Sequence, residues 1–520
     1  MSLFGRLLGF KDPSPNVLRI AAVVLTIGSV WSIAFQISTT FWMIYIAEAL
    51  GGGDILLGLG LVGILVMVRL AIQTLLDFPT GGIGDWLGQR WIVASALVCY
   101  SLSFWLTSTV TPTTPFPVFL LIYILMGLGA SQESGAVEAW FDNNYRVAMP
   151  HDQDRKQFGV FSARRGMLFQ LVSTIILIPG SFIALLYSRA LIFQVQAVLF
   201  IGLAIMSLLF IRDLPGARQE PKKRPSLREY GGLLKDGLKF VGSSRFVTFT
   251  FIGQMFMWAV GITWWNILLF PFYFGYLLSD IAVATFRTTM FAPMVVAAER
   301  SGTWSKRFDP VKWIPRFNLI YFGSLGFFFG LVLITLVFPS YIAAAPFITL
   351  YLPFTAFPIL TLPLSSVVPI FLIYILFVLT DALGRITEIL NQRVMIDVFP
   401  NRIRNCMYSL RPTVAMLFAL PVIFTISQLI PVFGFPLIFS ICGFLALIGA
   451  LLIRKGFSYP IPKDRTILEE ISRDKEAVEA THQPHEDIPT TPPEPIEVPA
   501  NGLEPTETPE EKIEETTGKP

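Results

Sequence analysis

The sequence contains little charge for its length. Of its 520 residues, 14% are Asp, Glu, Lys or Arg and 53% are hydrophobic, whereas a soluble domain carries about 25% charge. Histidine and cysteine are also scarce, with three of each. Cys99, Cys406 and Cys442 form neither a metal-binding spacing nor a disulfide framework. These shortages argue against an ordinary soluble enzyme, a zinc protein and a redox protein.

Long apolar segments fill most of the chain. A helix that crosses a bilayer needs about 20 apolar residues. By this criterion, we expect six spans in the first half, at 18–47, 55–80, 91–110, 116–142, 158–187 and 190–211. After a basic connector at 212–245, we expect six more, at 246–273, 279–299, 317–338, 367–392, 406–430 and 432–453.

The distribution of lysine and arginine gives the expected orientation, because short cytoplasmic loops collect these residues. With both termini inside, 35 of the 39 fall in the termini, the inside loops and the inside ends of spans. Of the other four, Arg189 lies outside and three lie within spans, namely Arg69, Arg287 and Arg385. We therefore expect a multi-pass protein of the cell (plasma) membrane with both termini, 1–17 and 454–520, in the cytoplasm. The first apolar segment lacks a small-residue cleavage site, so we do not expect a cleaved signal peptide.

Two segments are unlike the spans. Residues 317–380 carry no charge, and five prolines interrupt their middle part, which opposes a regular helix. We expect an apolar outer loop at 339–365 on the membrane interface, with re-entry into the membrane as the second possibility. Residues 454–520 hold 16 acidic and 8 basic residues and many prolines. Such a segment buries too little apolar surface to fold, so we expect a disordered acidic cytoplasmic tail.

The two halves contain related features. The fifth span opens with Phe161-Ser162-Ala163-Arg164 and the eleventh with Tyr408-Ser409-Leu410-Arg411, and the second and eighth spans each hold one arginine. Transporters often contain such internal repeats. The sequence thus predicts an all-α polytopic membrane protein with twelve transmembrane helices in two pseudo-symmetric six-helix bundles, at 18–211 and 246–453.

Two motifs resemble those of a known family. The loop 79–90 reads PTGGIGDWLGQR, which is similar to the G-x-x-x-D-R-x-G-R-R motif of the major facilitator superfamily (MFS) of membrane transporters. The fourth span ends in SGAVEAWFD at 134–142, which resembles a pattern of many prokaryotic members. The resemblance implies the MFS fold and a cytoplasmic gate network, rather than a substrate site, formed by Gly81, Asp85, Gly88, Arg90, Glu138, Asp142 and Arg164.

The same resemblance implies a central cavity lined by spans one, four, seven and ten. It places ten residues at a substrate or proton site: Glu133, Asp381, Arg385, Gln36, Thr40, Trp42, Gln254, Trp258, Trp265 and Asn266. Ionisable residues inside spans are functional candidates, and aromatic walls with a few polar groups suit an organic solute. Two alternatives stay open, since Asp381 and Arg385 could be a structural pair and Trp265 an ordinary core residue. Arg69, Arg287 and Glu388 are expected to be intramembrane charge partners.

The expected function is secondary active transport of a small organic solute by alternating access. An acid within the membrane, Glu133, suggests that transport is coupled to protons. No Walker loop, kinase signature or HExxH motif occurs, so we expect neither ATP-driven transport nor enzymatic activity, and no cofactor or metal. An exporter of lipid-like or multidrug type, and a non-transporting receptor or scaffold of the same fold, remain alternatives. The expected partners are a small-molecule substrate, protons and the lipid bilayer, without nucleic acid, and the chain is expected to be a monomer.

Overall fold

A computed structural model gives the structure of the chain. It describes residues 3–133, 135–152, 155–217, 235, 239–340, 346–351, 354–356, 358–398 and 404–462. Residues Met1–Ile467 form one compact unit. Most of the expected acidic tail and the middle of the basic connector lie outside the described residues.

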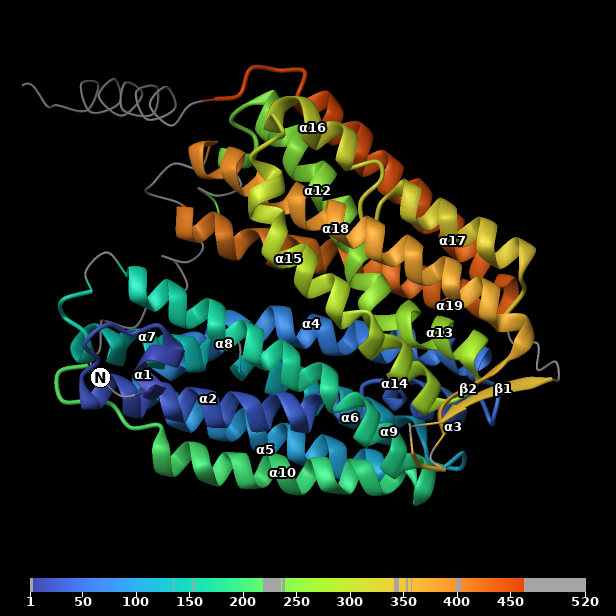
Figure 1. The fold of residues 1–520 in the computed structure, drawn as a ribbon, viewed down its shortest axis with the longest axis horizontal. Coiled ribbons are helices and arrows are strands. Elements are labelled where there is room, and N and C mark those ends of the chain that lie inside the picture. Colours follow the sequence, from blue (N-terminus) through green and yellow to red (C-terminus); the bar gives the residue numbers. More distant parts are fainter. Residues whose placement is uncertain are drawn as a thin grey trace, which may run out of the picture. The chain divides into compact units, whose positions relative to one another are not determined.

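Helices make up most of the described chain (Figure 1). The N-terminal half contains α1 (Leu3–Leu8), α2 (Pro15–Gln36), α3 (Trp42–Leu50), α4 (Ile55–Leu87), α5 (Gln89–Ser108), α6 (Phe116–Glu133), α7 (Ala136–Ala148), α8 (Lys156–Ile175), α9 (Leu177–Leu186) and α10 (Arg189–Phe210). The C-terminal half contains α12 (Arg245–Thr263), the π-helix η1 (Trp264–Leu268), α13 (Leu269–Leu277), α14 (Asp280–Thr289), α15 (Phe291–Ser305), α16 (Pro310–Phe317), α17 (Leu325–Val337), β1 (Phe347–Tyr351), β2 (Pro358–Pro363), the 3-10 helix η2 (Leu364–Ser366), α18 (Val367–Val398) and α19 (Arg404–Gly456).

Ten helical segments of the described chain are long and apolar enough to cross a membrane. This number is lower than the twelve that the sequence predicts. The last segment, Leu410–Gly456, covers two of the expected spans, and within it Gly434 has a non-helical backbone with φ of 66°. A further expected span, 317–338, contains the shorter apolar helix α17 of 13 residues. The chain is therefore a mostly helical, multi-pass membrane protein.

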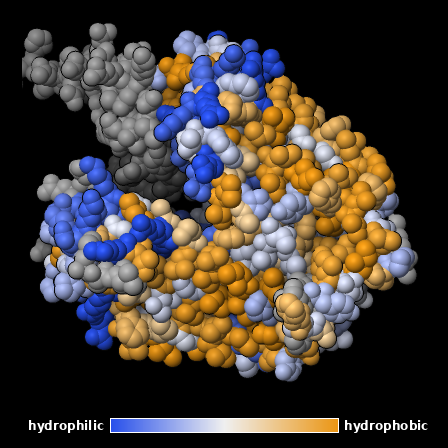
Figure 2. Space-filling model, in the orientation of Figure 1, coloured by the Kyte–Doolittle hydropathy of each residue, from blue (hydrophilic) through white to orange (hydrophobic). Residues whose placement is uncertain are grey.

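The buried cores show how the two halves meet. One core lies within the N-terminal half, where Phe104 and Phe200 stack with ring centroids 5.5 Å apart. A second core is shared, since it joins Val62 and Leu65 of α4 to Ile423 of α19. Apolar side chains also cover much of the outer surface (Figure 2), as lipid contact requires. The interface between the halves is largely apolar, with a few hydrogen bonds such as the one from Gln428 of α19 to the Gly60 carbonyl of α4.

The segment predicted as an apolar outer loop, 339–365, contains a β-hairpin. Strands β1 and β2 pair in antiparallel register, with Thr349 opposite Thr361. The prolines are compatible with this pairing because Pro358 and Pro363 lie at the two ends of β2, where a missing amide proton costs least. Helix α14 contacts β2, so the hairpin packs on the C-terminal half. We call this end of the molecule the hairpin end. The opposite end, where α1 and α7 lie with Arg6 and Arg146 in their last turns, is the basic end (Figure 1).

Glycines allow two close helix contacts. A side chain at Gly58 of α4 would clash with the backbone carbonyl of Ala47 in α3. A side chain at Gly63, one and a half turns further along α4, would clash with Ser427 of α19. The first contact lies within the N-terminal half and the second lies between the halves.

We predict that Gly58→Ala destabilises the protein by about 1–3 kcal/mol, because the added methyl group meets rigid backbone. The melting temperature of the detergent-purified protein would measure this. Gly202→Ala is the matched control, since Gly202 of α10 has open space around it and alanine favours a helix. Equal melting temperatures for the two variants would contradict the close contact of α3 with α4.

Candidate functional site

A cavity of about 330 Å³ lies between the two halves. Its size is near the lower limit for small-molecule pockets. Four helical regions contribute to it: the end of α2, the α8–α9 junction, the η1–α13 segment and the α14–α15 junction. The lining residues are Gln36, Thr39, Gln170, Ser173, Thr174, Leu177, Trp265, Phe270, Arg287, Phe291 and Met294.

Three helix interruptions border this cavity. α8 passes into α9 at Ile176, α14 passes into α15 at Met290, and the π-helix η1 interrupts the helical path between α12 and α13. Interrupted helices expose backbone groups that a regular helix would satisfy internally, and transporters place such breaks at their binding sites. Here the Thr288 hydroxyl donates a hydrogen bond across the halves to the carbonyl of Thr174, at 3.2 Å.

The cavity wall combines neutral polar groups, aromatic rings and one charge. The amides of Gln36 and Gln170 and the hydroxyl of Ser173 face aromatic and aliphatic residues of the C-terminal half. Of the described residues that line the cavity, Arg287 alone is charged. The wall can therefore accommodate a small organic solute with an apolar part and several hydrogen-bonding groups.

Two of the ten predicted substrate or proton residues, Gln36 and Trp265, line the cavity. Two other predicted residues, Thr40 and Trp42, make contacts within the N-terminal half. Thr40 is 3.0 Å from the hydroxyl of Ser181, and the ring of Trp42 stacks on Tyr123 at 5.3 Å. The polar atoms of Thr40 and the ring of Trp42 are thus engaged in helix packing.

The other three span-seven candidates lie outside the cavity wall. Asn266 accepts a hydrogen bond of 2.6 Å from Arg69, which joins η1 to α4 and hence the two halves. Gln254 is buried, and Trp258 lies 4.7 Å beneath the guanidinium of Arg411. Asn266 is therefore a link between halves, whereas the sequence placed it among the substrate ligands.

The acidic candidates are also absent from the cavity wall. In α18, Asp381 Oδ2 lies 3.6 Å from Arg385 Nε, so the pair that their spacing predicts is present. Glu388 is exposed one turn further on. Glu133 ends α6 and is partly buried, with Glu138 and Asp77 as its electrostatic neighbours. Within the described chain, no cation forms an ion pair with Glu133.

An ion cluster that the sequence did not predict joins the halves at the hairpin end. Arg189, which begins α10, binds Asp280 of α14 through two parallel hydrogen bonds of 2.7 and 2.9 Å. It also binds Glu48 of α3 at 2.5 Å. Such a bidentate pair is among the stronger polar contacts in proteins. The sequence signal was Arg189 itself, the single base expected on the outer side.

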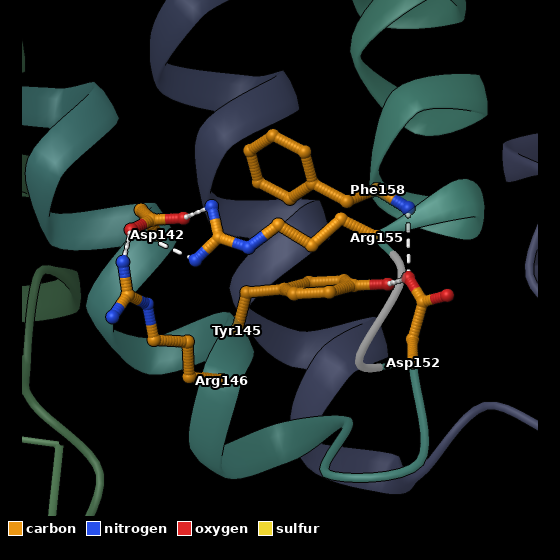
Figure 3. Close-up of polar contacts among 6 residues, drawn as sticks. All are labelled: Asp142, Tyr145, Arg146, Asp152, Arg155 and Phe158. Atoms are coloured by element: carbon orange, nitrogen blue, oxygen red, sulfur yellow. Dashed lines mark hydrogen bonds and ion pairs between the residues drawn. The ribbon is translucent and has the colours of Figure 1, made fainter. Parts of the chain in front are cut away.

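A second cluster lies at the basic end, within the N-terminal half (Figure 3). Asp142 of α7 pairs with Arg146 at 2.9 Å and with Arg155 at 2.7 Å. The Tyr145 hydroxyl donates a hydrogen bond of 2.7 Å to Asp152. Burial alone would raise the pKa of Asp152, but hydrogen bonds from Tyr145 and from the amides of Phe158 and neighbouring residues hold it below its usual value. These contacts fix the connection between α7 and α8.

The remaining residues of the predicted gate network have separate contacts. Glu138 pairs with Arg165 at 3.3 Å, and Arg164 donates to the carbonyls of Arg6 and Leu7 in α1. Arg90 lies over the ring of Trp91.

In the motif loop itself, Gly88 has a φ of 99° and joins α4 to α5. This backbone conformation is the one that favours glycine. The side chain of Asp85 and the surroundings of Gly81 lie outside the described residues. The structure thus describes the α1, α7 and α8 contacts of the network, but not the contacts of Asp85.

The described residues contain no group of three or more His, Cys, Asp or Glu side chains that could hold a metal ion.

Comparisons with solved structures show which fold the chain has, whereas comparisons with protein families and curated proteins find no match. The nucleoside transporter NupG has a TM-score of 0.58 at 12% identity, covering 86% of this chain and 100% of that one. A D-xylose-proton symporter has a TM-score of 0.56 at 14% identity, covering 86% and 98%.

A third similar structure is a bacterial homolog of the human lysosomal transporter Spinster, in an inward-facing and occupied conformation. Its TM-score is 0.52 at 14% identity, and the match covers 84% of this chain and 92% of that one. All three proteins are membrane transporters, and each is matched over nearly its whole length. The chain therefore has the fold of these transporters.

Proposed function

We propose that the protein is a proton-coupled secondary active transporter of a small organic solute. The observation that carries this proposal is the cavity between the halves, bordered by three interrupted helices. The similarity to solved nucleoside and D-xylose-proton transporters supports it. Transport occurs by alternating access, in which residues 18–211 rock against residues 246–453 around the cavity.

The topology that accompanies this function has twelve spans in two six-helix bundles. It counts α19 as two helices that meet at Gly434 and includes α17 as a span. The basic end faces the cytoplasm, because positive residues collect on that side. Both termini therefore lie on the cytoplasmic side of the plasma membrane. Figure 2 shows a recess between hydrophilic surfaces at the basic end. With Arg189 joining the halves at the hairpin end, this arrangement corresponds to an inward-facing state.

The Arg189 cluster is the outer gate in this mechanism. It is partly buried, with side-chain exposures of 20% for Arg189 and 13% for Asp280, and it connects the halves where they must part. Loss of Arg189 removes two ion pairs and leaves the carboxylates of Glu48 and Asp280 repelling each other. The outward-facing state then becomes more populated.

We predict that Arg189→Ala increases access to the cavity from outside. Ser173→Cys, in a background without Cys99, Cys406 and Cys442, provides a label site in the cavity wall. The rate of modification by a membrane-impermeant maleimide added outside should rise about tenfold, which corresponds to about 1.4 kcal/mol.

The control for this experiment is Arg155→Ala, which removes an ion pair of similar geometry within one half. It should leave the labelling rate unchanged. An unchanged rate in folded Arg189→Ala protein, or an equal rise in the control, would refute the gate assignment.

The proton site in this proposal is Glu133. It is a partly buried acid at the end of α6, next to the break before α7, and its electrostatic neighbours are acids. Such a carboxylate can accept a proton in one state and release it in the other. Asp381 is less suited to this role because Arg385 neutralises it.

We predict that reconstituted protein accumulates its solute only while a pH gradient exists. Glu133→Gln should abolish accumulation but retain exchange of solute across the membrane, because exchange requires no net proton movement. Glu299→Gln is the control, since Glu299 is an exposed acid of α15, and it should accumulate solute normally.

Proteoliposomes loaded at different internal pH, with labelled solute outside, measure both activities. Accumulation by the wild type after a protonophore collapses the gradient would rule out proton coupling. Normal accumulation by Glu133→Gln would move the proton site to another residue.

A further inference from the structure

Arg287 occupies an unusual position for a charged residue. It lies in α14, within the membrane-spanning segment Asp280–Ser305, and its side chain lines the cavity. A charge at this depth is expensive unless other groups compensate it. The contacts of its guanidinium group therefore indicate what it is there to bind.

The protein compensates this charge only weakly. Nη1 of Arg287 is 3.7 Å from the sulfur atoms of Met290 and Met294, which are weak acceptors. Its guanidinium carbon lies 5.3 Å from the ring centre of Trp265 and 5.5 Å from that of Phe377. These rings attract a cation but accept no ordinary hydrogen bond.

No carboxylate in the described part of the chain forms an ion pair with Arg287. The acid that acts on it electrostatically is Asp381, and Asp381 Oδ2 also lies 3.6 Å from Arg385 Nε. By contrast, Arg155, Arg165 and Arg189 each form an ion pair with an acid of the chain. The guanidinium of Arg287 thus has unused hydrogen-bond donors next to an open cavity.

The rest of the cavity wall adds no negative charge. The nearby polar groups are neutral, and part of their capacity is already used, since the Thr39 and Thr174 hydroxyls donate to backbone carbonyls. Gln36 and Ser173 remain as hydrogen-bonding groups on the opposite wall. The one formal charge among the described lining residues is therefore positive.

We propose that Arg287 binds the negatively charged group of the transported solute, so that the substrates are small organic anions. This inference rests on the proposed transport function and names its substrate class. The planar guanidinium offers two parallel N–H bonds, which match a carboxylate or a phosphate monoester. The rings of Trp265 and Phe270 contact the apolar part of the solute, and Gln36 and Ser173 bind its hydroxyl groups.

The cavity limits the size of this solute. A volume of about 330 Å³ lies at the lower end of the range for small-molecule pockets. A hydroxy acid, an aromatic acid or a phosphorylated triose fits this volume, whereas a lipid does not. Size and charge together therefore separate this substrate class from that of a lipid exporter.

The test compares anions with neutral molecules of the same shape. The full-length protein in detergent is titrated with benzoate, malate and glycerol 3-phosphate, and with their neutral counterparts benzamide, malamide and glycerol. We expect at least one anion to raise the melting temperature in a saturable manner, while its counterpart does not. The carboxylates and the phosphate ester form separate arms, which show the anionic group that the site prefers.

Variants then show whether the stabilising anion binds at Arg287. Arg287→Met should weaken binding of the active anion at least tenfold. Arg287→Lys should weaken it less, because lysine keeps the positive charge but lacks the two parallel N–H donors of the guanidinium group. Arg165→Met, which removes a charge paired with Glu138, should bind like the wild type. The wild-type comparison of anion with neutral counterpart stands even if Arg287→Met fails to fold.

Two results would overturn the inference. One is a wild type that no anion of the panel stabilises, and the other is an Arg287→Met variant that binds the anion with unchanged affinity. Exchange assays in proteoliposomes separate this failure from failure of the proposed function. If neutral solutes exchange and anions do not, the protein is a transporter with another substrate class. If a stabilising anion binds at Arg287 but does not exchange, the anion site is supported and the transport proposal fails.

Discussion

The cost of a charge or an unpaired polar group in the membrane governs this structure. Several intramembrane polar groups have partners in the chain: Arg69 donates a hydrogen bond to Asn266, and Arg385 lies 3.6 Å from Asp381. Two polar contacts, Arg69 with Asn266 and Arg189 with Asp280, join the N-terminal half to the C-terminal half. Arg287 differs because its guanidinium faces a cavity and contacts sulfur atoms and aromatic rings.

The contacts between the halves are of a kind that can be exchanged. Packing of α4 on α19 is mostly apolar, with glycine at the close approach and a hydrogen bond of 2.6 Å from Gln428 to the Gly60 carbonyl. The polar links are few and discrete, and the strongest lies at the hairpin end. Helix interruptions lie around the cavity between these links. In the proposed mechanism, a few discrete links on a largely apolar interface allow two stable arrangements rather than continuous deformation.

The similarity to solved transporters has a particular meaning at 12–14% identity. A membrane fold of this kind depends on apolar helices of the right length and on close helix packing, and many sequences meet those requirements. The residues that line a cavity are few and vary independently of the fold. The substrate class must therefore be argued from this chain's own wall, which combines one guanidinium, two amides and several rings.

Apolar length, charge distribution and repeats determined the membrane class and the approximate helices, because each span must satisfy its own backbone in hydrocarbon. The Asp381–Arg385 pair was equally predictable, since residues four apart in a helix are neighbours. The hairpin at 347–363 was not, because strand pairing depends on residues that the helical criterion does not compare. Only the tertiary structure decided which span faces which. In the folded protein, Thr40 and Trp42 contact neighbouring helices. Gln170 and Arg287 line the cavity, and Arg189 pairs with Asp280. Those outcomes depend on helix rotation and on the breaks at Ile176, η1 and Met290, which are set by packing between elements far apart in the chain.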